Sequence, residues 1–207
     1  MPLRILALGD SYTIGEAVDP AERWPAQLAR RLRSAGFDLA DPVIIATTGW
    51  TTAELAAALD AASPAGPFDL VTLLIGVNDQ YRGLPCDESY RARLDALILR
   101  AVASAAGDPS RVVVLSIPDW GVTPFANGRD RARIAAEIDA FNEVNRAAAA
   151  GAGARWLDVT PVSREAARDP GLLAGDGLHP SAAMYARWVE LLLPHARAIL
   201  APSVSGS

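Results

Sequence analysis

LRILALGDS, residues 3–11, is the segment that decides the fold of this 207-residue chain. Its apolar run is too short for a helix of ordinary length and predicts a strand that is buried on both faces. Gly9-Asp10-Ser11 then places a hydroxyl just beyond the carboxyl end of that strand, where open α/β sheets bind their ligands. The same tripeptide is also typical of a turn in which Asp or Ser caps the next segment. The role of Ser11 therefore depends on what the rest of the chain brings to this edge.

Four more apolar or β-branched runs follow the first, and amphipathic segments with helical spacing separate them. The runs are residues 42–46, 69–75, 111–117 and 155–159. Strands that alternate with helices in this way pair in parallel through right-handed crossovers and build a three-layer α/β/α sandwich. Because no linker or internal repeat interrupts the pattern, we expect one domain over residues 1–201 and a loose tail over residues 202–207.

Three local features predict how single segments begin and end. Residues 12–15 are expected to form a loop in which Gly15 is free to take a positive φ. Ser181 is placed to cap the last helix. Pro194 lacks a backbone N–H, so that helix is expected to kink or restart there.

The composition fits an ordinary globular protein and excludes several kinds of function. Apolar residues make up 51% of the chain, charged residues 21%, and the formal net charge is −5. A negative charge without a basic stripe argues against a nucleic-acid partner. Cys86 is the only cysteine, which excludes an internal disulfide and a thiolate metal cluster. The chain shows neither a leader-like start nor an apolar run long enough for a membrane span, so we expect a cytoplasmic protein.

Three later residues bear on Ser11 because each follows a predicted strand. Gly49 follows the second strand, Asn78 the third, and His179 lies in the region after the fifth. Loops after parallel strands meet at one edge of the sheet, so a hydroxyl, an unshielded backbone N–H, a carboxamide and an imidazole are expected there together. These are the groups that acyl transfer needs: a nucleophile, a base and donors to an oxyanion.

The chemistry suggests one role for each group. A serine hydroxyl is a weak nucleophile at neutral pH and needs an imidazole, here His179, to take its proton. Asp176, three residues before the histidine, is placed to fix the tautomer of the ring. The expected oxyanion hole consists of the backbone N–H groups of Ser11 and Gly49 and the side-chain amide of Asn78.

In order and spacing, four blocks of the chain resemble those of the SGNH/GDSL hydrolase family. The blocks are Gly9-Asp10-Ser11, Gly49, Gly76-x-Asn78-Asp79 and Asp176-x-x-His179. No single block is specific, and Gly49 is the weakest, but the four together span nearly the whole chain. The resemblance implies a flavodoxin-like, parallel five-stranded sheet of order 2-1-3-4-5, a serine nucleophile, and neither a metal nor an organic cofactor. It also implies that Asp10 and Asp79 support the site through hydrogen bonds. The family includes esterases, lipases, thioesterases, and deacetylases of carbohydrates or peptidoglycan.

Aromatic residues lie close in sequence to the loops that carry these blocks. They are Tyr12, Trp50, Tyr81, Trp120 and Phe125. An aromatic residue on a loop is as often local packing as a ligand contact, but several at one rim suggest an apolar pocket. The loops after the first three strands are short, and only residues 118–128 are long enough to wall that pocket. This favours short-chain acyl or acetyl esters over long-chain ones.

The sequence therefore predicts a serine hydrolase that cleaves small carboxylic esters through an acyl-enzyme intermediate. The alternative is a flavodoxin-like protein that binds a nucleotide or phosphate without hydrolysis, because residues 9–15 superficially fit a phosphate-binding loop. Neither Gly-Lys-Ser/Thr nor G-x-G-x-x-G is present at this loop, however, and this alternative leaves His179 and Asn78 without a role.

Overall fold

A five-stranded parallel sheet forms the centre of the protein. The computed structural model describes residues 1–201, so the tail predicted for residues 202–207 lies outside the described residues. The strand order is β2-β1-β3-β4-β5, which confirms the α/β class and the 2-1-3-4-5 order that the family resemblance implies. The strands are β1 (Ile5–Gly9), β2 (Val43–Ala46), β3 (Leu70–Leu74), β4 (Val112–Leu115) and β5 (Arg155–Leu157).

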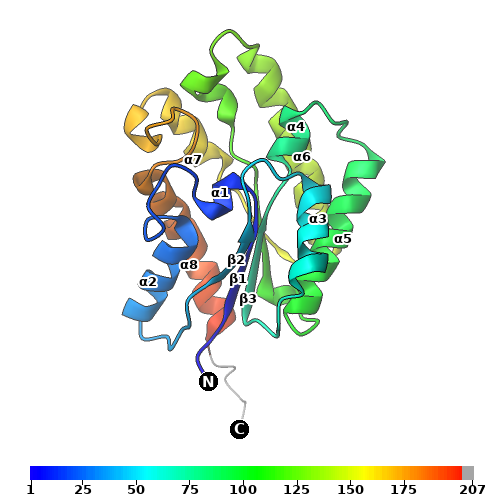
Figure 1. Cartoon of the computed structure of the whole chain (residues 1–207), viewed down its shortest axis with the longest axis vertical. Helices are drawn as coiled ribbons and strands as arrows, with labels where there is room; N and C mark the ends of the chain where they lie inside the picture. The colour runs from blue at the N-terminus through cyan, green and yellow to red at the C-terminus, as the bar shows by residue number, and fades with distance from the viewer. Residues whose placement is uncertain (202–207) are drawn as a thin grey trace.

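Helices cover both faces of the sheet and complete the three layers (Figure 1). One face is covered by two helices that also pack on each other, and the other face by three. The first pair is α2 (Trp24–Ser34) and α8 (Ala182–Leu200); the second set is α3 (Thr52–Ala62), α5 (Glu88–Ser104) and α6 (Arg131–Gly151). Because helices cover both faces, every residue of β1 and β3 is buried, as their largely apolar sequences predict.

The register of the central strands makes three of them end at one level. Gly9, the last residue of β1, pairs with Ala46 of β2 on one side and Leu74 of β3 on the other. The segments that leave these strands therefore start side by side. They are the segments that carry Ser11, Gly49 and Asn78 in the sequence.

The segment after β1 differs from the expected loop. Residues Ser11–Ile14 form one helical turn, α1, whose N-cap is Asp10: its Oδ1 accepts a hydrogen bond from the backbone N–H of Tyr12 at 3.0 Å. Gly15 ends the turn with φ 74°, in the left-handed region that was expected of it. The sequence suggested that Asp or Ser could cap the next segment, and the loop prediction is wrong because the Asp10 cap starts a helical turn there.

The last helix runs through its proline. Ser181 caps α8 as predicted, accepting a hydrogen bond from the backbone N–H of Met184 at 3.4 Å. Of the kink or restart expected at Pro194, the restart is wrong because one helix continues to Leu200. Proline removes one helical hydrogen bond, whereas the buried apolar face of α8 continues past it.

None of the helices within residues 1–201 is both long and apolar enough to cross a membrane. The cytoplasmic location expected from the sequence stays a prediction.

Candidate active site

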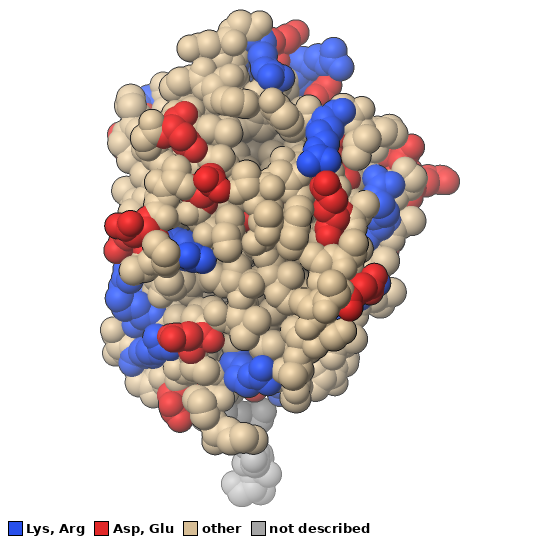
Figure 2. All heavy atoms as spheres, in the orientation of Figure 1, with Lys and Arg blue, Asp and Glu red and all other residues tan. Residues whose placement is uncertain are grey.

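A cavity of ≈ 140 Å³ opens at the edge of the sheet where β1 and β3 end. Figure 2 shows a hollow in the upper half of the molecule, and mostly uncharged residues surround it. The lining residues are Ser11, Tyr12, Thr48, Gly49, Val77, Asn78, Tyr81, Trp120, Phe125, Leu178 and His179. The nucleophile, base and oxyanion residues suggested by the sequence thus line one cavity.

The predicted aromatic residues divide into two groups. Tyr12, Tyr81, Trp120 and Phe125 line the cavity, whereas Trp50 does not. The ring of Trp50 packs against the hydrophobic core, and the residue contributes to the site through its backbone carbonyl instead.

Asp176 and His179 form a close pair at the rim of the cavity. The Oδ2 atom of Asp176 lies 2.6 Å from Nδ1 of His179, and its Oδ1 accepts hydrogen bonds from the backbone N–H groups of Leu178 and His179, both at 3.0 Å. Burial acts to raise the pKa of Asp176, but these hydrogen bonds outweigh it and hold the pKa below its usual range. An ionised carboxylate at Nδ1 favours the tautomer with the proton on that nitrogen, so Nε2 is left to accept a proton.

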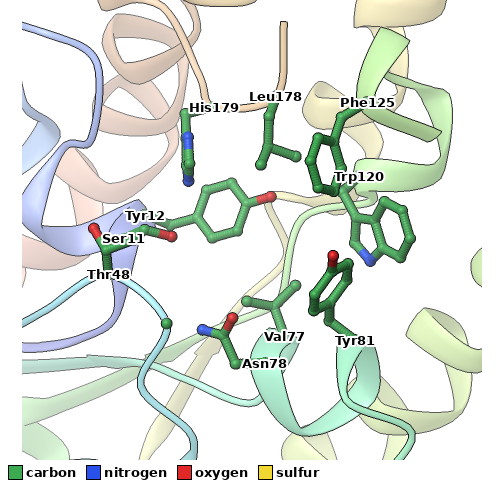
Figure 3. A pocket seen from close by; sticks show the side chains of 11 residues that line it. Ser11, Tyr12, Thr48, Val77, Asn78, Tyr81, Trp120, Phe125, Leu178 and His179 are labelled. Carbon is green, nitrogen blue, oxygen red and sulfur yellow. The ribbon is translucent and has the colours of Figure 1, made fainter. Parts of the chain in front are cut away.

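Ser11 is the first residue of α1 and is only 5% exposed. In Figure 3 the edge of the His179 ring points toward the side of the cavity where Ser11 and Thr48 lie. The structure contains no direct hydrogen bond from the Ser11 hydroxyl to the ring within residues 1–201. Bonds of this kind often form fully only once substrate is bound.

Gly49 must be a glycine because of its backbone rather than for lack of space. Its φ is +86°, in the left-handed region that side chains disfavour, whereas an added Cβ would meet only Nη2 of Arg82, at 3.7 Å. The same Nη2 donates a hydrogen bond to the carbonyl oxygen of Gly49 at 2.5 Å.

The side chain of Asn78, from α4 (Val77–Tyr81), also holds this loop. Its Nδ2 donates a hydrogen bond to the carbonyl oxygen of Trp50 at 2.9 Å. A carboxamide nitrogen carries two N–H bonds, so one is used to fix the group and the other remains available to the cavity that Asn78 lines. Because the donor is fixed in advance, little reorganisation is needed when an anion forms beside it.

Asp79, also on α4, connects this helix to the end of the loop that carries Gly49. Its carboxylate accepts two hydrogen bonds from Thr52, from the backbone N–H at 2.9 Å and from the hydroxyl at 2.7 Å. Asp79 is fully buried, and its charge is balanced by Arg93, whose Nη2 lies 3.7 Å away. The carboxylate thus ties Thr52, the first residue of α3, to the turn that carries Asn78.

Asp10 is fully buried behind the Ser11 turn. Burial is the main reason that its pKa is raised from 3.8 to about 8, and the nearby charge of Asp79 adds to the shift. One of its oxygens caps α1, whereas Oδ2 has no hydrogen-bond partner within residues 1–201. Because the carboxyl group of Asp10 itself accepts the N–H of Tyr12 at the start of α1, this turn is less suited to bind an added anion, which disfavours the nucleotide-binding alternative.

Asp10→Asn should make the protein relatively more stable as the pH rises. The folded protein keeps a proton on Asp10 that the unfolded chain releases, so this group lowers the free energy of unfolding as the pH rises from about 4 to about 8. An asparagine keeps the cap and does not titrate. We therefore expect the free energy of unfolding of the variant, relative to that of the wild type, to increase from about pH 5 to about pH 8 when both are measured by urea unfolding. The exposed Asp38→Asn is the control, and an equal difference at both pH values would contradict the raised pKa.

Three aromatic rings form the apolar wall of the cavity opposite Ser11 (Figure 3). Tyr81, Trp120 and Phe125 contact one another, with ring centroids 5.4 to 6.0 Å apart. The guanidinium of Arg129 lies over all three, 5.1 to 5.8 Å from their centroids. The indole Nε1 of Trp120 donates a hydrogen bond to the side-chain oxygen of Gln80 at 2.8 Å, which fixes the ring.

Several residues of the site were missed from the sequence. Thr48, Val77 and Leu178 also line the cavity, and each directly adjoins a residue that was identified. Their position next to a motif residue is the signal by which they could have been found from the sequence. The roles of Gln80 and Arg82 depend on contacts with distant segments and leave no local pattern.

Within residues 1–201 no group of three His, Cys, Asp or Glu side chains is placed to hold a metal ion. Burial, and secondarily the charge of Asp87, raises the pKa of the Cys86 thiol, so the thiol stays protonated at neutral pH.

Comparisons with known proteins agree with this geometry. Residues 7–187 match the sequence profile of the GDSL-like Lipase/Acylhydrolase family. Esterase TesA of Pseudomonas aeruginosa is 26% identical over 200 residues, which cover 95% of this chain and 89% of TesA. A crystal structure of TesA has a TM-score of 0.73 at 26% identity, covering 95% of this chain and 99% of that one. Axe2, an acetylxylan esterase from Geobacillus stearothermophilus, has a TM-score of 0.69 at 20% identity, covering 97% and 95%.

The family match extends over most of the chain and includes all four sequence blocks. The five-stranded sheet and its strand order agree with the same assignment. The chain therefore belongs to the GDSL-like lipase/acylhydrolase family and is an esterase of that family.

Proposed function

We propose that the protein hydrolyses small carboxylic esters with Ser11 as nucleophile. The observation that carries this proposal is the shared cavity, which joins the Ser11 hydroxyl, the His179–Asp176 pair and the Asn78 amide. As Ser11 Oγ bonds to the ester carbonyl carbon, His179 Nε2 takes the hydroxyl proton. The electron pair of the carbonyl moves to its oxygen, which accepts hydrogen bonds from Gly49 N–H, Ser11 N–H and Asn78 Nδ2.

The remaining steps reuse the same groups. The bond to the leaving alcohol breaks, its oxygen takes the proton from His179, and an acyl-enzyme remains on Ser11. A water then gives a proton to His179 and bonds to the acyl carbon. Ser11 leaves with the proton from His179, which releases the carboxylic acid and restores the enzyme.

Asn78→Ala should lower kcat by roughly 10²–10³-fold with little change in KM, because the amide acts on charge that exists only in the transition state. The variant also loses the bond to Trp50, so Asn78→Asp is a useful second variant: it keeps the shape and removes the donor. Steady-state kinetics on p-nitrophenyl acetate measures both constants. If kcat does not change in either variant, Asn78 is not part of the oxyanion hole.

We further propose that short-chain acyl or acetyl esters are preferred. The three rings of the wall close a cavity of only ≈ 140 Å³, and the name of the structurally similar Axe2, an acetylxylan esterase, agrees with a small acyl group. Each methylene that fits should contribute up to about 0.8 kcal/mol, and the first that does not fit should reverse the trend.

A series of p-nitrophenyl esters tests the preference. We expect kcat/KM to reach its maximum between acetate and hexanoate. A rate that still rises at decanoate would mean that the cavity opens to accept long chains, and the short-chain proposal would be wrong.

A further inference from the structure

Tyr12 places one polar atom in the apolar part of the cavity. Its side chain is 4% exposed, and its ring lies near those of His179 and Trp188, with centroids 5.4 and 6.4 Å away. Figure 3 shows the ring extending from the Ser11 side across the cavity, with its hydroxyl between Leu178 and the aromatic wall. The other residues around that end of the cavity are apolar or aromatic.

The Tyr12 hydroxyl makes no hydrogen bond to the protein within residues 1–201. Two other tyrosines differ: the Tyr81 hydroxyl accepts a bond from Arg129 at 3.3 Å, and the Tyr90 hydroxyl donates one to Asn145 at 2.7 Å. The Tyr185 hydroxyl also has no partner within residues 1–201, but it is buried and does not line the cavity. Burial is the main cause that raises the pKa of Tyr12, so the group is a neutral phenol that can both donate and accept.

An all-carbon acyl chain that reaches this hydroxyl displaces water from it and offers no replacement. Burying a hydroxyl without a partner is unfavourable, and a polar site discriminates against analogues that leave its polar groups unpaired. A chain with an oxygen atom at the right depth would supply the missing partner. The four letters that name the family, GDSL, end in leucine, whereas this chain reads Gly9-Asp10-Ser11-Tyr12 and adds a hydroxyl there.

We propose that the Tyr12 hydroxyl makes the enzyme selective for short acyl groups that carry an ether or hydroxyl oxygen within the chain. This inference rests on the proposed function and narrows its substrate class from short acyl esters to oxygenated ones. Tyr12 acts here as a specificity-determining residue, because it contacts the acyl group and not the reacting atoms.

Three matched pairs of p-nitrophenyl esters test the proposal. Methoxyacetate, 3-methoxypropanoate and 4-methoxybutanoate are compared with butanoate, pentanoate and hexanoate, which have the same chain lengths. Each ratio of kcat/KM is divided by the ratio of hydroxide-catalysed rates, which removes the intrinsic effect of the oxygen. We expect at least one pair to favour the ether by about 3- to 10-fold, the range for one net hydrogen bond.

Tyr12→Phe should remove that preference by raising the rate of the all-carbon ester and lowering that of the ether. The matched control is Tyr81→Phe, which deletes the hydroxyl of another cavity tyrosine whose hydrogen bond is already made. It should keep the preference. A preference that survives Tyr12→Phe, or that is absent from all three pairs in the wild type, overturns the inference. Failure of the proposed function is distinct, because then no ester of either kind is hydrolysed in a Ser11-dependent way.

Discussion

Replacing Ser11 with alanine should abolish ester hydrolysis and labelling by an organophosphonate, while the protein remains folded. The proposed acyl-enzyme forms on the Ser11 hydroxyl, so we expect kcat to fall by roughly 10⁴-fold or more when that hydroxyl is removed. The fold should tolerate the change, because the cap of α1 uses the side chain of Asp10 and the backbone of Tyr12. Hydrolysis of p-nitrophenyl acetate, intact mass after treatment with the phosphonate, and the thermal unfolding midpoint measure the three effects.

Ser116→Ala is the matched control for labelling. Ser116 is fully buried and directly follows β4. It is thus a second serine that lies just beyond the end of a central strand, as Ser11 does after β1. Its hydroxyl bonds to Asp158, Val159 and Thr160 away from the cavity. This variant should lose stability and keep its label. If Ser11→Ala still accepts the phosphonate, another residue is the nucleophile and the proposed mechanism is wrong.

The fold was predictable from sequence because its signals are local. The apolar run of β1 is buried along its whole length. A parallel strand that is covered on both faces can be recognised from such a run alone, whichever strands it pairs with. The positions of Ser11, Gly49 and Asn78 followed for the same reason, since each lies a few residues beyond the end of a strand. Strand order was not derivable from the pattern and came from the family resemblance.

The rest of the site depends on contacts between segments far apart in the chain. Arg82 fixes the carbonyl of Gly49 from the end of α4, and Gln80 fixes the ring of Trp120 from a position 40 residues away. Trp50 was predicted to line the pocket because it adjoins Gly49 in sequence, and this is wrong. Its ring packs on the core, and only its carbonyl oxygen contacts a residue of the site, Asn78. Sequence proximity identifies the loop, whereas side-chain direction is set by packing.

Replacing His179 with alanine should be nearly as severe as losing Ser11, because a serine hydroxyl without a base is a poor nucleophile at neutral pH. His195 provides the matched control: it is the other of the two histidines, and it lies on α8 and does not line the cavity. His195→Ala should keep wild-type kinetics. Activity of His179→Ala close to that of the control would show that a different group acts as the base.

The pH profile tests the pairing of His179 with Asp176 more closely. An imidazole accepts a proton only in its neutral form, so kcat/KM of the wild type should fall toward acid. Hydrogen bonds keep the pKa of Asp176 below its usual range, so the carboxylate stays ionised as the pH falls and continues to hold the ring. Asp176→Asn removes that charge but keeps the base, and we expect a smaller loss of kcat than in His179→Ala. A loss of kcat in Asp176→Asn as large as that in His179→Ala would mean that Asp176 does more than hold the ring of the base.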